Sequence, residues 1–175
     1  KGEIVREVEV KSRNNDLHMR FRMCRKLENG NYLCMISCDN EIREIDPTGK
    51  LVRVIRDLPG VKLAKAHAVM RLGNGNTLFS TGAGAMAVEV DKEDKVVWKL
   101  ERKDVPEIKM GFMTGMNRLA NGNTVISFYQ GSHHVIEVTP EKEVVWKWRL
   151  PSQRTVVSVQ VLDGAGDASK GQVIK

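Results

Sequence analysis

The sequence predicts an all-β fold, a β-propeller built from four-stranded antiparallel blades. Three observations predict it. The segment LENGNYL at 27–33 recurs as LGNGNTL at 72–78 and as LANGNTV at 119–125, so that the turn glycines lie 45 and 47 residues apart. Each copy is followed by a motif like Glu-Val-Asp, and then by one like Lys-Val-Val-Trp. Repeats of about 45 residues that hold short strands and no helical periodicity are typical of propeller blades.

The middle repeat reads as four short strands joined by turns. An apolar strand is followed by Asn74-Gly75, a hairpin signal because both residues tolerate the positive φ of a type I′ turn. The second strand ends at Gly82-Ala83-Gly84, and a polar turn at 91–94 separates the third strand from the fourth. The predicted strands are 67–72, 77–81, 86–90 and 96–100.

The first and third repeats fit the same frame, and partial repeats flank them. Blades are predicted at 19–57, 66–101 and 112–150. Residues 2–6 resemble 49–53, so residues 1–10 are expected to form the outer strand of a preceding blade. Residues 156–162 precede Asp163-Gly164 as an innermost strand precedes its turn, so 155–175 are expected to begin a further blade.

About three complete blades, with partial blades at both ends, are fewer than a closed ring usually holds. The ends could complete a fourth blade, although no segment is evident for its third strand. The chain could instead be an arc of a larger, six- to eight-bladed ring, or two chains could join their open ends. The larger ring is the favoured interpretation, because an open arc leaves two sheet faces exposed. Self-association through the open ends is the second.

The composition describes a globular protein. The chain has 175 residues, of which 41% are hydrophobic and 29% charged, and no run approaches the ~18 apolar residues of a membrane span. It begins at Lys1 without an apolar segment, so the amino terminus does not indicate the cellular compartment. The net charge of +6 is spread in alternation with apolar and acidic residues, as on exposed strand faces. We therefore expect neither nucleic-acid nor membrane binding.

Three cysteines, Cys24, Cys34 and Cys38, lie in the first repeat alone. A two-residue turn at Asn29-Gly30 would set residue 25 against residue 34, with the two thiols on opposite faces. A one-residue bulge would set Cys24 against Cys34 and allow a cross-strand bridge. Free buried thiols are the favoured state, and the spacing gives no support for a metal site.

The pattern H-x-x-x-R-L-x-N-G-N-T-L, then V-x-E-V-D and K-V-V-W, resembles the repeat of bacterial pyrroloquinoline-quinone-like and arylsulfotransferase-like β-propellers. Arg53 and Arg6 depart from it at the tryptophan position of the fourth strand, and Thr114 departs from it at the position of His67. The resemblance implies a periplasmic or secreted protein, with a cytoplasmic one as the alternative. No cofactor is expected. The best copy is carried by His67, Arg71, Leu72, Asn74, Gly75, Asn76, Glu89, Val90, Asp91, Val97 and Trp98.

The Asn-Gly turns close one rim of a propeller, so the linkers between blades and the loops between second and third strands gather at the other. Counting back from each turn glycine places Arg22, His67 and Thr114 at the mouth of the channel on that second rim. Lys65 lies in a linker close to His67, and a loop of the third blade carries Gln130 and His133. These six residues are the candidate ligand-binding set.

His67 is the one candidate catalytic residue. Beside Arg22 and Lys65 it could act as a nucleophile or general acid on an anionic group, as a channel histidine does in arylsulfotransferase-like propellers. The favoured interpretation is structural, with His67 bonded to the next blade. His133 and His134 are adjacent, so they cannot chelate one metal and are expected at an exposed loop tip. Trp98, Trp146 and Trp148 are expected to pack between blades.

Two functions follow from these candidates. The favoured one is a non-catalytic binding or scaffold module that holds a protein, glycan or small ligand at the loop-rich rim. The alternative is a channel-centred enzyme, sulfotransferase-like or quinone-dependent, that uses His67 with Arg22 and Lys65. Fold alone does not choose between them, because propellers host many unrelated activities.

Overall fold

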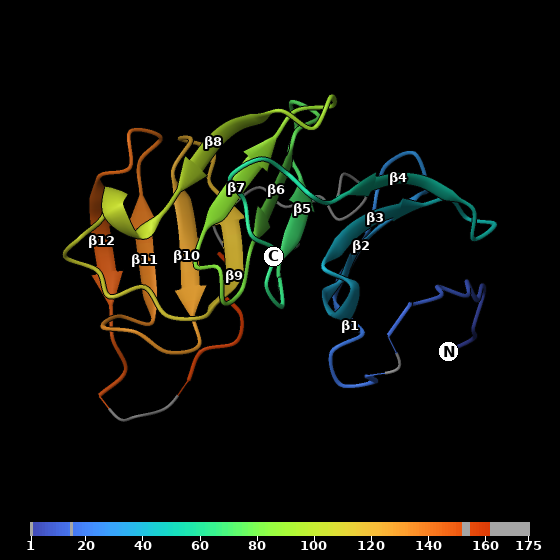
Figure 1. Cartoon of the computed structure of the whole chain (residues 1–175), viewed down its shortest axis with the longest axis horizontal. Helices are drawn as coiled ribbons and strands as arrows, with labels where there is room; N and C mark the ends of the chain where they lie inside the picture. Colours follow the sequence, from blue (N-terminus) through green and yellow to red (C-terminus); the bar gives the residue numbers. More distant parts are fainter. Residues whose placement is uncertain (1, 15, 152–154, 162–175) are drawn as a thin grey trace.

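Three four-stranded antiparallel sheets make up the protein, and the fold class is that of a β-propeller. The structure, a computed structural model, describes residues 2–14, 16–151 and 155–161. The sheets lie side by side as blades 1, 2 and 3, with blade 1 at one end of the long axis and blade 3 at the other (Figure 1). Blade 1 has strands β1 (Phe21–Lys26), β2 (Tyr32–Ile36), β3 (Glu41–Ile45) and β4 (Leu51–Ile55). Blade 2 has β5 (Val69–Arg71), β6 (Thr77–Ser80), β7 (Ala87–Val90) and β8 (Val96–Leu100); blade 3 has β9 (Met113–Arg118), β10 (Thr124–Phe128), β11 (Val135–Val138) and β12 (Val144–Trp148).

The Asn-Gly-Asn turns close the first hairpin of each blade, but they are not type I′ turns. Only the glycine has positive φ, at 85° for Gly30, and Leu27 faces Asn31 through a hydrogen bond of 2.7 Å, so the loop has one residue more than predicted. The Asn29 side chain accepts the N–H of Asn31 at 3.0 Å, which fixes this turn without left-handed backbone at the asparagine. A three-residue loop with glycine in the left-handed region matches the strand twist equally well.

The core lies between neighbouring sheets. Phe79 and Val88 of blade 2 pack with Leu33 and Ile42 of blade 1, and the opposite face of blade 2 packs on blade 3 around Phe128. Each of these side chains is almost fully buried. Burying a side chain of this size stabilises a fold by roughly 1.5–3 kcal/mol relative to leaving it exposed. One blade alone could not bury both of its faces.

Ion pairs repeat at the two junctions between blades. Arg71 of blade 2 contacts Glu44 of blade 1 at 2.6 Å, and Arg118 of blade 3 contacts Glu89 of blade 2 at 2.7 Å. Asn31 and its counterparts in the other turns donate to the same recurring glutamates. The glutamate of each repeat therefore has a structural role.

A second link repeats between each fourth strand and the outer turn of the next blade. Trp98 Nε1 donates to the carbonyl of Pro140 at 2.8 Å, and the Arg118 guanidinium lies 5.1 Å above the Trp98 ring. Arg53, which replaces this tryptophan in blade 1, donates to the Asp91 carbonyl at 2.8 Å. The substitution thus keeps the link while changing the donor.

The amino-terminal segment continues this series of links. Residues 2–14 form no strand, so the outer strand expected at 1–10 stays a prediction, one that needs neighbouring strands of a preceding blade to pair with. Even so, Arg6 donates to the Pro47 carbonyl at 3.2 Å, the bond that Trp98 makes to Pro140. Val8 and Val10 pack against the apolar face of blade 1.

The described part of 155–175 also follows the pattern of the repeat. Thr114 Oγ1 donates to the carbonyl of Val156 at 3.1 Å, much as Ser80 Oγ donates to the carbonyl of Thr114 at 3.2 Å. Val156 therefore meets blade 3 where an innermost strand would lie, although residues 155–161 form no strand. The rest of the predicted further blade, 162–175, lies outside the described residues. Within the described ranges, no helix has the length and apolar character needed to cross a membrane.

Candidate functional site

Linkers and loops gather at the rim opposite the Asn-Gly turns. Ala64 in the first linker bridges to Gly82 in a loop of blade 2, and Met110 in the second linker bridges to Gly131 in a loop of blade 3. The backbones meet so closely that a Cβ on Gly111 would overlap the carbonyl oxygen of Gln130. The glycines of these loops are therefore needed for packing, and they form no phosphate-binding loop.

His67 lies half-buried where the first linker enters β5, and its ring contacts the edge of Phe112 at a centroid distance of 6.3 Å. Its Nδ1 is buried and has no hydrogen-bond partner among the described residues. Burial, and then the charge of Arg22, lower the pKa of His67 below its ordinary value. The imidazole is therefore neutral at pH 7, and the expected structural hydrogen bond to the next blade is not made within the described chain.

Two arginines at the entry to blade 1 lie close together in the chain: Arg22, whose charge acts on His67, and Arg20, whose carbonyl accepts the Ser37 N–H. The Nε atoms of Arg20 and Arg22 are buried and have no hydrogen-bond partner in the described part of the chain, and no carboxylate there contacts either guanidinium. Arg22 Nη2 contacts only the sulfur of Met19, at 2.6 Å, and a thioether is a weak acceptor. The Ser37 hydroxyl, in the loop whose N–H bonds the Arg20 carbonyl, is also buried without a partner.

This arrangement contrasts with that of three other partly buried arginines, although Arg25, also partly buried, likewise has no carboxylate partner among the described residues. Arg43, Arg71 and Arg118 each contact a carboxylate within 2.7 Å. A partly buried cation without a counter-charge costs free energy unless an anion joins it. We call Arg20, Arg22, Ser37 and His67 the mouth cluster.

The other predicted candidates do not join the mouth cluster as free groups. Thr114 is buried, and its hydroxyl bonds Ser127 and the Val156 carbonyl, so it is a packing residue. Lys65 has a left-handed backbone, with φ of 58°, and its N–H donates to Asn40 Oδ1 at 3.2 Å. The Lys65 ammonium makes no ion pair with the described residues, which leaves it available at the rim.

The loop of blade 3 is divided between exposed and buried residues. Gln130 is exposed, while His133 Nδ1 lies 3.1 Å from the Ser132 hydroxyl. Partial burial, followed by Lys147, lowers the pKa of His133. His134 is buried rather than at an exposed loop tip, because its Nδ1 accepts the Leu150 N–H at 3.0 Å and its ring meets Trp148. His134 thereby joins the loop to the outer strand.

The three tryptophans do not share one role. Trp98 packs between blades 2 and 3, as predicted. Trp146 and Trp148 instead keep 49% and 40% of their surface exposed on β12. The difference follows from position, because the described residues place no further blade beside blade 3.

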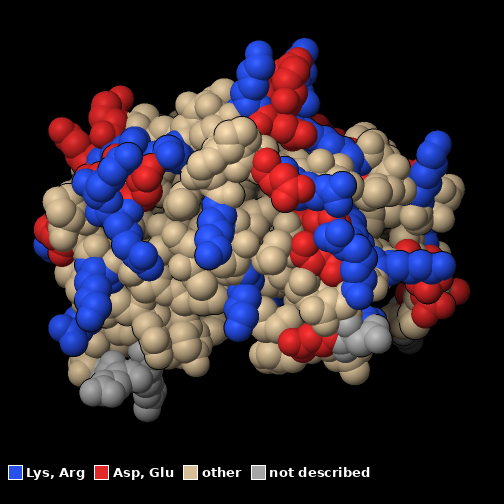
Figure 2. Space-filling model, in the orientation of Figure 1, with Lys and Arg blue, Asp and Glu red and all other residues tan. Residues whose placement is uncertain are grey.

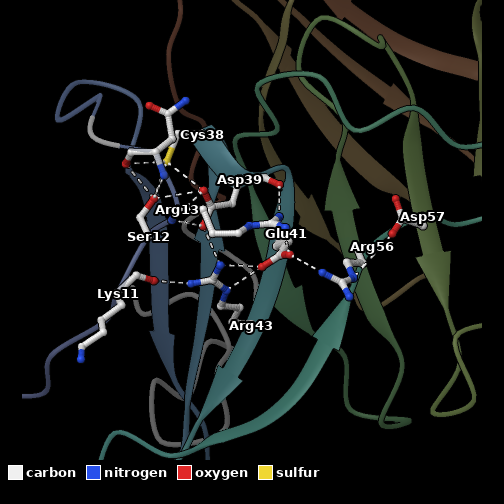
Figure 3. A network of polar contacts seen from close by, with 10 residues as sticks. Lys11, Ser12, Arg13, Cys38, Asp39, Glu41, Arg43, Arg56 and Asp57 are labelled. Atoms are coloured by element: carbon white, nitrogen blue, oxygen red, sulfur yellow. Dashed lines mark hydrogen bonds and ion pairs between the residues drawn. The ribbon is translucent and has the colours of Figure 1, made fainter.

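A carboxylate–arginine network on blade 1 ties the amino-terminal segment to the same rim (Figure 3). Glu41 contacts Arg13 at 2.7 Å, Arg43 at 2.5 Å and Arg56 at 2.9 Å. Burial alone would raise the pKa of Glu41, but the hydrogen bonds from Arg43 and Arg56 outweigh it and lower the pKa. Asp39 likewise bonds Arg43 and the N–H of Arg13.

These carboxylates and arginines neutralise one another, so the network holds residues 11–14 against blade 1 and is not a candidate binding site. A cavity of about 580 Å³ lies between residues 9–13 and strands β3 and β4. Its arginines are already paired with the buried carboxylates. The mouth cluster, whose cations lack counter-charges, is therefore the better candidate for ligand binding.

Sequence reasoning missed Arg20, Ser37 and Phe112 in the mouth cluster and its surroundings, and it missed the Glu41 network altogether. A signal for the network was present. Glu41 and Arg43 stand where blade 2 has Met86 and Val88, so each is a charged departure from an apolar repeat position. Departures from the repeat mark individual function or structure better than its recurring residues do.

Charge over the molecular surface is mixed. Figure 2 shows lysine and arginine interspersed with aspartate and glutamate over the visible face. A nucleic-acid-binding surface would instead have its lysines and arginines clustered in one patch, where they can neutralise the phosphates of the nucleic acid. Within the described residues, no three histidine, cysteine, aspartate or glutamate side chains are placed to hold a metal ion.

Comparison with solved structures places the chain among propeller proteins. A protein of unknown function from Bacteroides caccae superposes with a TM-score of 0.68 at 25% identity, over 81% of this chain and 54% of that one. Virginiamycin B lyase from Staphylococcus aureus, in a catalytically inactive form with quinupristin, gives a TM-score of 0.63 at 10% identity, over 86% and 48%. Hydrazine synthase from Kuenenia stuttgartiensis gives 0.62 at 11% identity, over 90% and 43%.

The chain thus spans about half the length of these proteins, and the likeness is one of fold. No family model matches the sequence. No curated protein matches it either.

Proposed function

We propose that this chain is a propeller binding module whose loop-rich rim holds a ligand or partner through an anionic group. The mouth cluster carries the proposal. Arg20 and Arg22 are partly buried cations to which the described residues offer no counter-charge, and the Ser37 hydroxyl beside them lacks a partner. A sulfate, phosphate or carboxylate would satisfy both needs through charge-assisted hydrogen bonds.

His67 and Lys65 extend the same recognition. Neutral His67 presents its imidazole without adding charge, and Lys65 is available from the adjacent linker. Gln130 and His133 on the loop of blade 3 would contact the body of a protein, glycan or small ligand. Neither a cofactor nor nucleic acid is part of the proposal, which places the protein in the periplasm or outside the cell.

Binding of inorganic sulfate and phosphate tests the proposal, by isothermal titration calorimetry on the full chain. Arg22→Gln should weaken binding of either ion by about tenfold, because one charge-assisted contact is worth about 1.4 kcal/mol or more. Arg102→Gln, which removes an exposed arginine of the second linker, should leave the affinity unchanged. Equal losses in both variants, or no binding to the unmodified protein, would overturn the proposal.

A channel-centred enzyme is the second candidate, in the manner of the arylsulfotransferase-like group. The favouring observation is His67, which is held neutral next to a cation and so resembles a poised base or nucleophile. The lyase among the structural neighbours is catalytically inactive in its histidine-to-alanine variant. If the chain is a channel-centred sulfotransferase, the unmodified protein turns over p-nitrophenyl sulfate and His67→Ala abolishes this turnover. Absence of turnover in the unmodified protein would contradict this second candidate.

Self-association through the open blade ends belongs to the same proposal. Trp146 is exposed where its counterpart Trp98 is packed against a neighbouring blade, and the described residues offer Glu137 no ion pair like those of Glu44 and Glu89. A second copy, meeting this end with the end where Arg6 lies, would cover both exposed faces. Two copies would also match the length of the structural neighbours.

A further inference from the structure

Cys24 and Cys34 face each other across the first hairpin of blade 1. The three-residue loop between Leu27 and Asn31 makes Cys24 the direct partner of Cys34, and their Sγ atoms lie 3.0 Å apart. Directly opposed residues on antiparallel strands have Cα atoms about 4.5–5.5 Å apart, within the range that a disulfide spans. We propose that this pair is a redox modification site, at which a small disulfide oxidant such as oxidised glutathione closes an intrachain bond between β1 and β2.

The third cysteine is not placed to compete. Cys38 lies beyond the end of β2 in the 3-10 turn Ser37–Asp39, where its sulfur is 3.0 Å from the Ser12 hydroxyl. The direct register also leaves Cys24 facing Cys34 rather than Cys38. Because the described residues include no metal-binding cluster, the pair has no evident metal to hold.

The two thiols differ in a way that suits stepwise oxidation. Cys24 is exposed, and the hydrogen bond with Cys34 lowers its pKa, so it supplies the attacking thiolate. Cys34 is buried, and the same hydrogen bond together with burial raises its pKa. The exposed sulfur is therefore the one that a soluble oxidant meets first.

The proposed exchange balances as two substitutions at sulfur. The Cys24 thiolate attacks one sulfur of oxidised glutathione, breaks its S–S bond and releases one glutathione thiolate. Cys34 then loses its proton to solvent and attacks the Cys24 sulfur, which releases the second glutathione. One S–S bond is broken and one is formed, and two electrons pass from the cysteine pair to glutathione.

The disulfide would cross-link β1, the strand that carries Arg22 of the mouth cluster, to β2. Arg22 lies two residues before Cys24 on β1, and Cys34 lies on the buried middle of β2. Both cysteines also line a cavity of about 220 Å³ beneath residues Arg6, Val8 and Val10. A cross-link here fixes β1 to its neighbour on the side where the amino-terminal segment rests.

The experiment treats the folded full-length chain with oxidised glutathione, alkylates free thiols with iodoacetamide and maps the tryptic peptides by mass spectrometry. Arg25 and Lys26 separate Cys24 from Cys34 after cleavage, so a bond between them appears as a linked pair of peptides, and fragmentation of the peptide 27–43 shows whether Cys34 or Cys38 carries the bond. The expected product joins Cys24 to Cys34 and leaves Cys38 alkylated. Thermal unfolding of this product should shift upward by about 5 °C, since a short closed loop restricts the unfolded chain.

Matched variants separate the proposal from non-specific oxidation. Cys38→Ser should form the same bond at the same rate, whereas Cys34→Ser should stop at a glutathione adduct on Cys24. A bond from Cys38 to either partner would overturn the proposal. Alkylation of both Cys24 and Cys34 after prolonged treatment of the folded protein would overturn it as well. Neither result depends on the anion-binding proposal, which sulfate titration tests separately.

Discussion

At the scale of single residues, His67 shows how the mouth cluster is set by burial rather than by residue type. Four histidines occur in the sequence, and nothing in their local context predicts that this one has a buried ring nitrogen without a partner. Counting from the turn glycine predicted that His67 and Arg22 lie at the mouth of the channel, and the structure has them just before β5 and within β1. The count did not find Arg20 or Phe112, because neither stands at the counted position of its repeat.

The lowered pKa of His67 predicts a pH dependence of stability. As the pH falls through about 6.5, His67 is protonated more readily in the unfolded chain than in the folded chain. The contribution of His67 to the free energy of unfolding is therefore complete above that pH and declines below it. Urea unfolding between pH 8 and pH 5.5 should therefore show a smaller decline in His67→Asn than in the unmodified chain. His18→Asn, at an exposed position, should keep the full slope.

Part of the decline belongs to His133, whose pKa is also lowered. The doubly substituted chain, His67→Asn with His133→Asn, should consequently be flatter than either single variant. An unchanged slope in His67→Asn would show that its imidazole is as readily protonated in the folded state as in the unfolded one.

At the scale of elements, the linkers pack on the loops of the following blade more tightly than sequence patterns suggested. The Gln130 loop is a candidate for ligand contact because it lies at the favoured rim, where the loop at Gly82-Ala83-Gly84 also lies. In the structure much of their backbone is covered by the linkers at 57–66 and 101–112. Loop position predicted the rim, but the contact between two loops distant in sequence could not be read from either one.

Two glycine substitutions, one at a tightly packed position and one at an open position, test this packing of linker against loop. Gly111→Ala should cost about 3 kcal/mol of the free energy of unfolding, because its Cβ would overlap the Gln130 carbonyl and the backbone would have to move. Gly73→Ala, with nothing within 4 Å of its Cβ, should change stability by less than about 0.5 kcal/mol. Urea unfolding of both variants makes the comparison, and similar values would show that the linker yields easily.

At the scale of the whole molecule, the repeated links between blades explain both its order and its open ends. Glu44–Arg71 and Glu89–Arg118 join successive blades, and the position of those arginines falls on Gln160 after blade 3. The fourth-strand donor passes from Arg6 to Arg53 to Trp98, and Trp146 is the next in that series. Arg6 thus extends the series before blade 1, whereas Trp146, on the last described strand, is half exposed.

The exposed end of blade 3 predicts concentration-dependent association. Sedimentation velocity should show a sedimentation coefficient that rises with protein concentration, because association buries Trp146 and its neighbours. Trp146→Ser should weaken this association, whereas Tyr129→Ser, at an equally exposed aromatic residue of the rim, should leave it intact. A monomer at all concentrations would overturn the proposed self-association.

The sequence by itself determined the repeat, the strand order within each blade and the rim at which loops gather. It could do so because turn glycines, alternation and period are local properties of the chain. Only the tertiary structure decided that the turn has three residues, which sets Cys24 against Cys34, and that Trp146 is exposed while Trp98 is covered. The same holds for the mouth cluster, since the charge balance of Arg20, Arg22 and His67 depends on which side chains from other blades come near them. Identical motifs acquire different roles because each blade has different neighbours.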